Sequence, residues 1–205
     1  MKRILVSLLV VCFTIAAWAQ NDDFVQYQLD NGLTVYLWED HDQPDVQGWT
    51  VTRAGAIDEP ADATGLAHYL EHMLFKGTDR IGALDWEKEQ PLYEQIIALY
   101  DTLALTTDAK AREAVQLRIN EVSLEAAKYA APDEFSNLIQ GIGGEGLNAF
   151  TAYDVTCYMN SFPAYQMERW LTLYADRLTN PVFRSFQAEL ENVFEEYNMY
   201  LDDNS

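Results

Sequence analysis

The chain has 205 residues, of which 49% are hydrophobic and 13% aromatic, so it can bury a core of its own. Its 33 acidic and 13 basic side chains give a formal net charge of -20. Such a composition does not provide the basic surface that phosphate binding requires. We therefore expect no nucleic-acid partner. The charge is explained by solubility, or alternatively by attraction of basic peptides toward a cleft.

The N-terminus has the pattern of a targeting segment. Lys2 and Arg3 precede an apolar run at residues 4–17, and Ala17-Trp18-Ala19 matches an A-x-A cleavage site. This pattern predicts a signal peptide at residues 1–19 and an exported protein, either periplasmic or secreted. Because the apolar run is too short to be a comfortable transmembrane helix, no stable membrane anchor is expected.

The mature chain would keep a single cysteine. Cys12 lies inside the predicted signal peptide, which leaves Cys157 alone. No intrachain disulfide is then available, although exported proteins meet an oxidising environment. Cys157 would be a buried free thiol or would link two chains.

The first part of the mature chain reads as strands. The segments 24–29 and 33–38 flank Asn31-Gly32, and this dipeptide is the strongest short signal for a β-hairpin. Residues 46–53 resemble a third strand.

A His-Tyr-Leu-Glu-His pentad at residues 68–72 is the most informative motif. Positions i and i+4 of a helix lie on one face, so His68 and His72 can hold one metal ion with Glu71 beside them. This is the motif of the inverted zinc peptidases. Two partly buried histidines satisfied by hydrogen bonds are the alternative, but that reading gives the intervening carboxylate no role.

The sequence around the pentad also predicts a helix. Asp62 or Thr64 can cap its start. Apolar residues recur at helical spacing and would pack the helix into a core: Leu66, Ala67, Leu70, Met73 and Leu74.

Residues 84–136 carry a different pattern. Two apolar runs in steps of four and three are separated by Thr106-Thr107-Asp108, and they comprise Leu92, Ile96, Leu99 and Leu103, then Val115, Ile119, Val122, Ala126 and Tyr129. These steps predict two helices packed as an antiparallel hairpin. The hairpin would be a packed elaboration of the surface or a docking arm for a partner.

Beyond the hairpin, we expect one strand at residues 148–159. Pro163 then precedes an amphipathic helix that ends at Asn180-Pro181. Strands and helices alternate without a strict βαβ rhythm, which favours an α+β fold with helices packed on a mostly antiparallel sheet.

The last predicted helix is rich in glutamate. Glu189 and Glu196 are two helical turns apart and fall on one side, whereas Glu191 and Glu195 point elsewhere. The apolar stripe of this helix comprises Leu190, Val193, Phe194, Tyr197 and Leu201. Periodicity alone does not decide which glutamate meets a metal, since an acidic helix face is usually solvated.

Three segments together resemble a known family. Residues 65–78 read GLAHYLEHMLFKGT, residues 146–154 read GLNAFTAYD and residues 189–196 read ELENVFEE. They resemble the pitrilysin/insulinase family of zinc metallopeptidases, which includes the mitochondrial processing peptidase. The resemblance extends over most of the chain from about residue 24.

The resemblance implies a zinc endopeptidase acting on peptides or unfolded proteins. His68, His72 and Glu196 would hold the zinc and leave a fourth position for water. Glu71 would take a proton from that water and pass it to the leaving amine. Glu189 would orient a ligand or adjust the local charge.

The family also has an edge strand on the substrate side, which Asn148 and Ala149 match. An extended peptide could add to this edge through main-chain hydrogen bonds. A structural strand in which Asn148 makes a turn hydrogen bond is the alternative reading.

Two departures from the family affect the expected domain organisation. His72 and Glu196 lie farther apart than in the family, and an inserted hairpin at about 84–136 would account for the difference. Family members also have a further homologous half. We therefore expect residues 20–205 to be an incomplete N-terminal metallopeptidase domain, from a truncated gene, a fragment or a split enzyme, that needs a second half or partner subunit.

Other functional classes remain open. The chain could be a non-catalytic scaffold or partner subunit, or an inactive fragment of a longer peptidase. An intact Glu71 argues against a scaffold. A metal-storage or acidic binding module is a third reading, for which more histidines would be expected.

Overall fold

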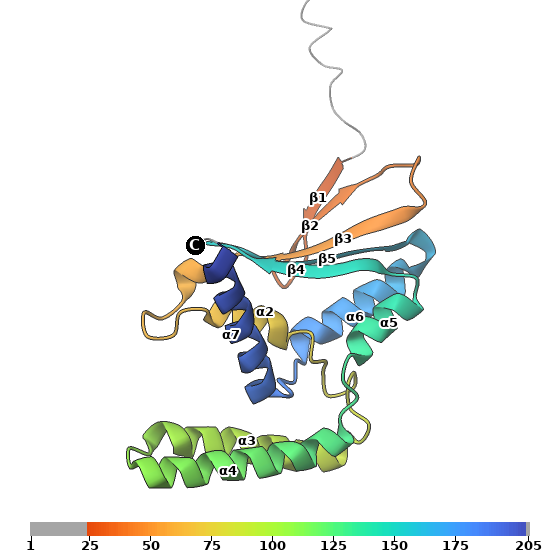
Figure 1. Cartoon of the computed structure of the whole chain (residues 1–205). Helices are drawn as coiled ribbons and strands as arrows, with labels where there is room; N and C mark the ends of the chain where they lie inside the picture. Colours follow the sequence, from red (N-terminus) through yellow and green to blue (C-terminus); the bar gives the residue numbers. More distant parts are fainter. Residues whose placement is uncertain (1–23, 204–205) are drawn as a thin grey trace, which may run out of the picture. The chain divides into compact units, whose positions relative to one another are not determined.

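The computed structural model describes residues 24–203, so the predicted signal peptide lies outside the described part of the chain. Strands and helices are mixed, and both sheets in this part are antiparallel, which confirms the α+β prediction (Figure 1). None of the helices between residues 24 and 203 has the length and apolar character needed to cross a membrane. The chain divides into two compact units, with the boundary at Pro44–Asp45, and each is described by itself.

The described part of the first unit is a β-hairpin. Strand β1 (Phe24–Gln28) pairs antiparallel with β2 (Thr34–Trp38), as predicted. Gly32 adopts a left-handed φ of 88°, and the Asn31 side chain accepts a hydrogen bond from the Leu33 N–H at 3.1 Å. The Asn-Gly pair thus forms the turn through the conformations that these residue types tolerate best.

The second unit contains a three-stranded antiparallel sheet. Its strands are β3 (Asp45–Thr52), β4 (Glu145–Thr151) and β5 (Thr156–Pro163), in the order β3-β5-β4. β5 is the central strand and is largely buried. β4 pairs with β5 alone among the described strands, so one of its edges carries unpaired backbone groups.

The prediction of one strand at residues 148–159 is wrong. The chain reverses between β4 and β5, and the Ala152 N–H donates to the Val155 carbonyl across the turn at 2.8 Å. Tyr153 and Asp154 lie exposed in this turn. The sequence did not indicate this turn, because residues 148–159 contain no glycine or proline and apolar residues lie on both sides of the turn.

Helices α5 (Glu134–Gly141) and α6 (Met167–Thr179) cover one face of this sheet (Figure 1). Gly48 in β3 permits the close packing, because a Cβ there would lie 2.4 Å from the Trp170 ring. The main core lies between sheet and helices and comprises Ile81, Phe135, Ile139, Ile142, Tyr158, Phe162, Trp170 and Tyr174.

The segment between the pentad and α5 forms the predicted helical hairpin. Helix α3 (Trp86–Leu105) and helix α4 (Ala109–Ala126) lie side by side (Figure 1). Asp108 caps α4 by accepting a hydrogen bond from the Ala111 N–H at 2.8 Å. Both helices are therefore confirmed, whereas the idea that they are an insertion into the domain stays a prediction.

Cys157 lies on the central strand and is a buried free thiol. Burial raises its pKa above the usual value for a thiol, so the reactive thiolate is disfavoured. Of the two expected roles of Cys157, the structure agrees with the buried thiol rather than with the link between chains.

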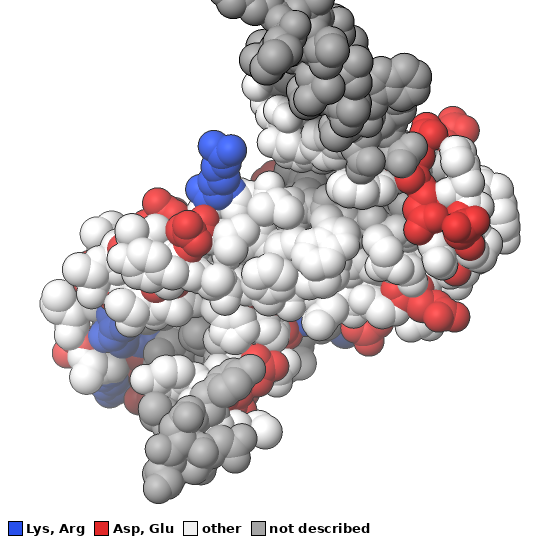
Figure 2. Space-filling view, turned by 90° about the horizontal axis from the view of Figure 1, so that it is seen from above, with Lys and Arg blue, Asp and Glu red and all other residues white. Residues whose placement is uncertain are grey.

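The charged surface is predominantly acidic. Figure 2 shows one face on which Asp and Glu side chains form patches while Lys and Arg side chains are sparse. This agrees with the formal net charge of -20. The absence of a nucleic-acid partner is not tested by this observation and stays a prediction.

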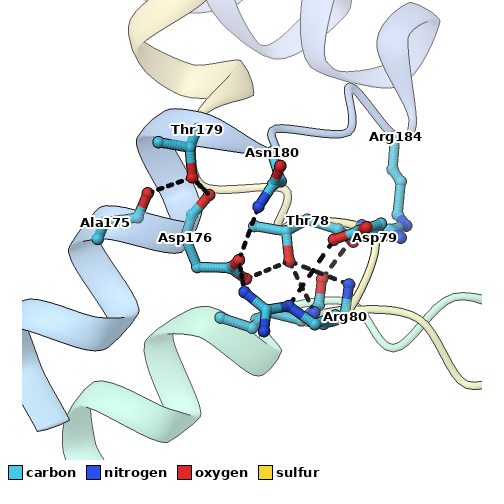
Figure 3. Close-up of polar contacts among 9 residues, drawn as sticks. Thr78, Asp79, Arg80, Ala175, Asp176, Thr179, Asn180 and Arg184 are labelled. Atoms are coloured by element: carbon cyan, nitrogen blue, oxygen red, sulfur yellow. Dashed lines mark hydrogen bonds and ion pairs between the residues drawn. The ribbon is translucent and has the colours of Figure 1, made fainter.

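A polar cluster around the buried Thr78 and Asp176 holds the loop after the pentad against α6 (Figure 3). Asp176 accepts hydrogen bonds from the Thr78 hydroxyl at 2.7 Å and the Asn180 amide at 3.1 Å, and it pairs with Arg80. Burial of Asp176 acts to raise its pKa, but the hydrogen bonds from Arg80, Thr78 and Asn180 outweigh it and hold the pKa below its usual value.

We expect Asp176→Asn to lower the free energy of unfolding at pH 7 by on the order of 1–3 kcal/mol, because ionised acceptors form the stronger hydrogen bonds. A carboxylate with a depressed native pKa stabilises the fold above its unfolded pKa of about 3.9, and that stabilisation fades as the pH falls through the native value. The difference between wild type and variant should therefore narrow toward pH 3.

Urea unfolding from pH 7 to pH 3 measures this difference. The exposed Asp101→Asn is the matched control and should change stability little at either pH. A deficit in Asp176→Asn that stays constant with pH would show that its charge does not contribute.

Candidate metal centre

The pentad lies on a short helix, α2 (Leu66–Met73), whose start is fixed by a carboxylate from the preceding loop. Asp62 and Thr64 do not cap it, so that prediction is wrong. The N-cap is Gly65, in a left-handed conformation with φ of 88°. Glu59 accepts hydrogen bonds from the Gly65 and Ala67 N–H groups, each at 2.8 Å. This places a negative charge at the helix N-terminus, where it is favourable.

The C-terminal end of α2 is hydrogen-bonded to a buried arginine. Arg177 of α6 is fully buried, and its Nε donates to the Leu74 carbonyl at 3.1 Å. Its guanidinium carbon lies 4.3 Å from the centre of the Phe75 ring, 4.6 Å from Phe135 and 4.1 Å from Tyr158. Burial lowers the pKa of Arg177 to about 10, so it is still a cation at neutral pH, stabilised by the rings.

Helix α7 (Phe186–Asp203) packs beside α2. Tyr69 and Met73 of α2 pack with Val193 of α7, and the Tyr69 hydroxyl donates to the Phe186 carbonyl at 2.5 Å. Three other residues of the predicted apolar stripe, Leu190, Phe194 and Tyr197, are exposed. The side of α7 that faces α2 is the one that carries Glu189 and Glu196.

The structure brings His68, His72 and Glu196 together. The Nε2 atoms of the two histidines are 3.1 Å apart, and they lie 3.6 Å and 3.5 Å from Oε2 of Glu196. Donor atoms around a tetrahedral zinc with bonds of about 2.0–2.1 Å would be about 3.3 Å apart. Two imidazoles and a carboxylate are also ligands that zinc commonly has. This donor set therefore fits a zinc ion, although its role as a metal site stays a prediction.

Glu189 lies behind the donor group rather than in it. Its Oε1 accepts a hydrogen bond from Nδ1 of His72 at 2.8 Å. Its Oε2 is 2.5 Å from the Lys76 ammonium and 3.2 Å from the Asn192 amide nitrogen. Because Nδ1 of His72 is occupied in this way, Nε2 is left to face His68 and Glu196.

The charge of Glu189 follows from these contacts. Burial acts to raise its pKa, but hydrogen bonds from Lys76 and His72 outweigh that effect and hold the pKa below its usual value. Glu189 is therefore an ionised acceptor at neutral pH. Sequence reasoning missed both Lys76 and Asn192, because nothing in the local pattern shows that they meet Glu189.

Glu71 points toward the sheet. Its side chain is buried, and its Oε2 accepts a hydrogen bond from the Thr151 hydroxyl of β4 at 2.5 Å. The backbone carbonyl of Glu71 accepts a longer hydrogen bond from the Tyr158 hydroxyl at 3.5 Å. One oxygen of the carboxylate is thus bound to the edge strand. Thr151 is a further contact that the sequence did not indicate.

Asn148 and Ala149 lie on the same edge strand, β4. They are opposite Met159 and Tyr158 of β5, and Asn148 is exposed while Ala149 is half-buried. The other edge of β4 pairs with no described strand. It is therefore geometrically able to accept an added strand, although substrate binding there stays a prediction.

Comparison with known proteins relates the chain to metallopeptidases. A family model described as "Insulinase (Peptidase family M16)" matches residues 34–90 and 110–204. The "Probable zinc protease PqqL" of Escherichia coli is 22% identical over 193 residues, which are 91% of this chain and 16% of that protein. An uncharacterised zinc protease of Streptomyces coelicolor is 26% identical over 151 residues, 73% of this chain and 22% of its own length.

Two solved structures have a similar fold. The first half of the periplasmic protease PqqL from Escherichia coli has a TM-score of 0.58 at 20% identity and covers 88% of this chain and 30% of its own. A protease from Helicobacter pylori has a TM-score of 0.56 at 19% identity and covers 84% and 30% respectively. The chain thus spans less than a third of each of these relatives.

We expect His68→Ala, His72→Ala and Glu196→Gln each to weaken zinc binding by more than about a hundredfold, because loss of a supporting residue alone typically costs about 10- to 100-fold. Glu189→Gln should have a milder effect. Competition with a chromogenic chelator measures the affinity.

Glu191→Gln and Glu195→Gln are the controls, since they remove a carboxylate from the same helix and should leave the affinity unchanged. A greater loss in Glu195→Gln than in Glu196→Gln would show that Glu195, and not Glu196, is the ligand. Full zinc binding by both histidine variants would rule out the site.

Proposed function

Since this chain belongs to the insulinase family of peptidases (peptidase family M16), we propose that it carries the metal centre of a zinc metalloendopeptidase that hydrolyses peptides or unfolded proteins. The observation that carries the proposal is the convergence of His68, His72 and Glu196 on one point. Relatives named as zinc proteases support the choice of metal and reaction.

The proposed chemistry assigns a separate task to each residue. Zinc bound by His68, His72 and Glu196 would supply a Lewis acid for the scissile carbonyl and would lower the pKa of water. Glu71 accepts the proton of the attacking water and returns it to the leaving amine. The Thr151 hydroxyl donates to one oxygen of the Glu71 carboxylate, and we assign the proton transfer to the other oxygen.

We place the substrate along the free edge of β4. An extended peptide would form main-chain hydrogen bonds with the backbone of Asn148 and Ala149 and would run beside Glu71, whose partner Thr151 is on the same strand. Main-chain recognition gives affinity with little sequence preference, which suits a peptidase for unfolded segments. The acidic surface would favour basic peptides.

A second homologous half or partner subunit would complete the site. The side chains of His68 and Glu196 are 35% and 45% exposed, so these residues of the centre are open to solvent. Large apolar side chains are also exposed on α7, beside the centre, at Leu190, Phe194 and Tyr197. Such a surface is typical of an interaction site. The partial coverage of the relatives agrees with this proposal.

We also propose that the protein is exported, as its N-terminal sequence predicts. The PqqL structure is described as that of a periplasmic protease, which supports a periplasmic location here. Residues 1–19, which would direct the export, lie outside the described part of the chain.

We expect Glu71→Gln to bind zinc as wild type does and to lose peptidase activity, because the substitution removes the base and leaves the three ligands. Zinc content and cleavage of an unstructured basic peptide are measured on the same preparations, with the candidate partner present. Loss of zinc with the activity, or normal turnover, would contradict the assigned role.

The chain alone should cleave the same peptide on the order of a hundredfold more slowly than the completed enzyme, because loss of precise substrate positioning costs rates of this size. The comparison is made with and without the partner chain, and Glu71→Gln gives the background rate. Rapid, chelator-sensitive cleavage by the monomeric chain would show that no second half is needed.

A further inference from the structure

Lys76 contacts the centre from the loop that follows α2. Its Nζ lies 2.5 Å from Oε2 of Glu189, and the other oxygen of the same carboxylate holds Nδ1 of His72 at 2.8 Å. The side chains are 26% exposed for Lys76 and 9% for Glu189, so this is a largely buried ion pair. Glu189 thus bridges Lys76 and His72.

We propose that Lys76 is a positioning residue of the metal centre, which acts on His72 through Glu189. Its backbone is held by Arg184, which in turn pairs with Glu89 of the helical hairpin. The inference rests on the proposed zinc site. It adds Lys76, Arg184 and Glu89, which have no direct contact with the three ligands, and it gives the hairpin a role in supporting the centre.

The physical reason lies in the geometry of the carboxylate. A carboxylate with a single partner can rotate, whereas Glu189 is held from both oxygens and from the Asn192 amide. Lys76 also compensates a buried negative charge that would otherwise be unpaired on that side. With Glu189 fixed, the His72 ring is fixed, and its Nε2 stays directed toward His68 and Glu196.

The backbone of Lys76 is held by the buried side chain of Arg184. Its NH1 donates to the carbonyls of Lys76 and Ile81 at 3.1 Å and 3.2 Å, and its NH2 donates to the Thr78 carbonyl at 2.7 Å. Figure 3 shows Arg184 beside the loop that carries Thr78. The loop follows the guanidinium closely, since a Cβ at Gly77 would lie 3.2 Å from NH1.

Glu89 of α3 completes the coordination of Arg184. Its two oxygens accept from Nε at 2.6 Å and from NH2 at 3.0 Å. The five N–H groups of a guanidinium are matched by these five hydrogen bonds. The pair is buried on both sides and fully hydrogen-bonded, which is the arrangement in which a buried ion pair fixes structure. The hairpin is thereby joined to the loop that carries Lys76.

Zinc affinity of the full chain tests the role of Lys76. Lys76→Met should weaken binding about tenfold, in the range for residues that support a ligand, and Lys76→Arg should restore most of the affinity. In a Glu189→Gln background, Lys76→Met should have no further effect. An unchanged affinity in Lys76→Met, or an equal loss in both backgrounds, would overturn the proposal.

A metal-free measurement separates this inference from the zinc proposal. In the ¹⁵N spectrum of histidine-labelled chain without metal, Lys76→Met should shift the His72 Nδ1 signal, because its hydrogen bond to Glu189 loosens. An unshifted signal would overturn the role of Lys76 even if zinc binds. Conversely, if the signal shifts but the wild-type chain binds no zinc, the contact between Lys76 and Glu189 positions His72 as proposed. The proposed metal site would then be refuted.

The hairpin contact is tested at Glu89. Glu89→Gln should weaken zinc binding several-fold, and Glu87→Gln, at an exposed position of the same helix, should not change it. If Glu89→Gln does not fold, Glu89→Asp keeps the charge but shortens the reach, and it should show the same direction of change. Wild-type affinity in a folded Glu89 variant would remove the hairpin from the proposal.

Discussion

The hydrogen bond from His72 to Glu189 is the contact on which the candidate centre depends. It joins α2 to α7 across 117 positions of sequence, at a donor–acceptor distance of 2.8 Å. It also selects which nitrogen of His72 faces the other donor groups. Packing of Tyr69 and Met73 with Val193 also holds α7 against α2, but this hydrogen bond is the contact that orients the His72 ring relative to α7.

Three charged groups, two of them buried, stabilise the position of α2. Glu59 accepts from the N–H groups at its start, Arg177 donates to the carbonyl at its end, and Glu189 holds a histidine on its outer face. Each of these groups is hydrogen-bonded, which offsets part of the cost of removing a charge from water. A helix of only eight residues is marginal by itself, so these tertiary contacts supply the rigidity that a metal site requires.

Local pattern predicted the parts of the molecule that depend on local geometry. The spacing of His68 and His72, the Asn-Gly hairpin and the apolar steps of α3 and α4 each follow from the geometry of one local element, and the structure agrees with all three.

The pairing of Glu196 with the histidines required the family resemblance, because the periodicity of α7 did not show which of its glutamates meets a metal. The contacts of Lys76, Thr151 and Arg184 could not be predicted, since each joins residues that only the tertiary fold brings together. The exposure of Leu190, Phe194 and Tyr197 on α7 could not be predicted either, because an apolar stripe does not show which of its residues another surface covers.

The most direct test of the account is zinc X-ray absorption spectroscopy on the purified chain loaded with one equivalent of zinc. The account predicts a four-coordinate site with two imidazole nitrogens at about 2.0–2.1 Å and oxygen in the remaining positions. A six-coordinate, all-oxygen environment would show zinc held by the acidic surface instead. A sulfur ligand would assign the metal to Cys157, and either result would contradict a centre built from His68, His72 and Glu196.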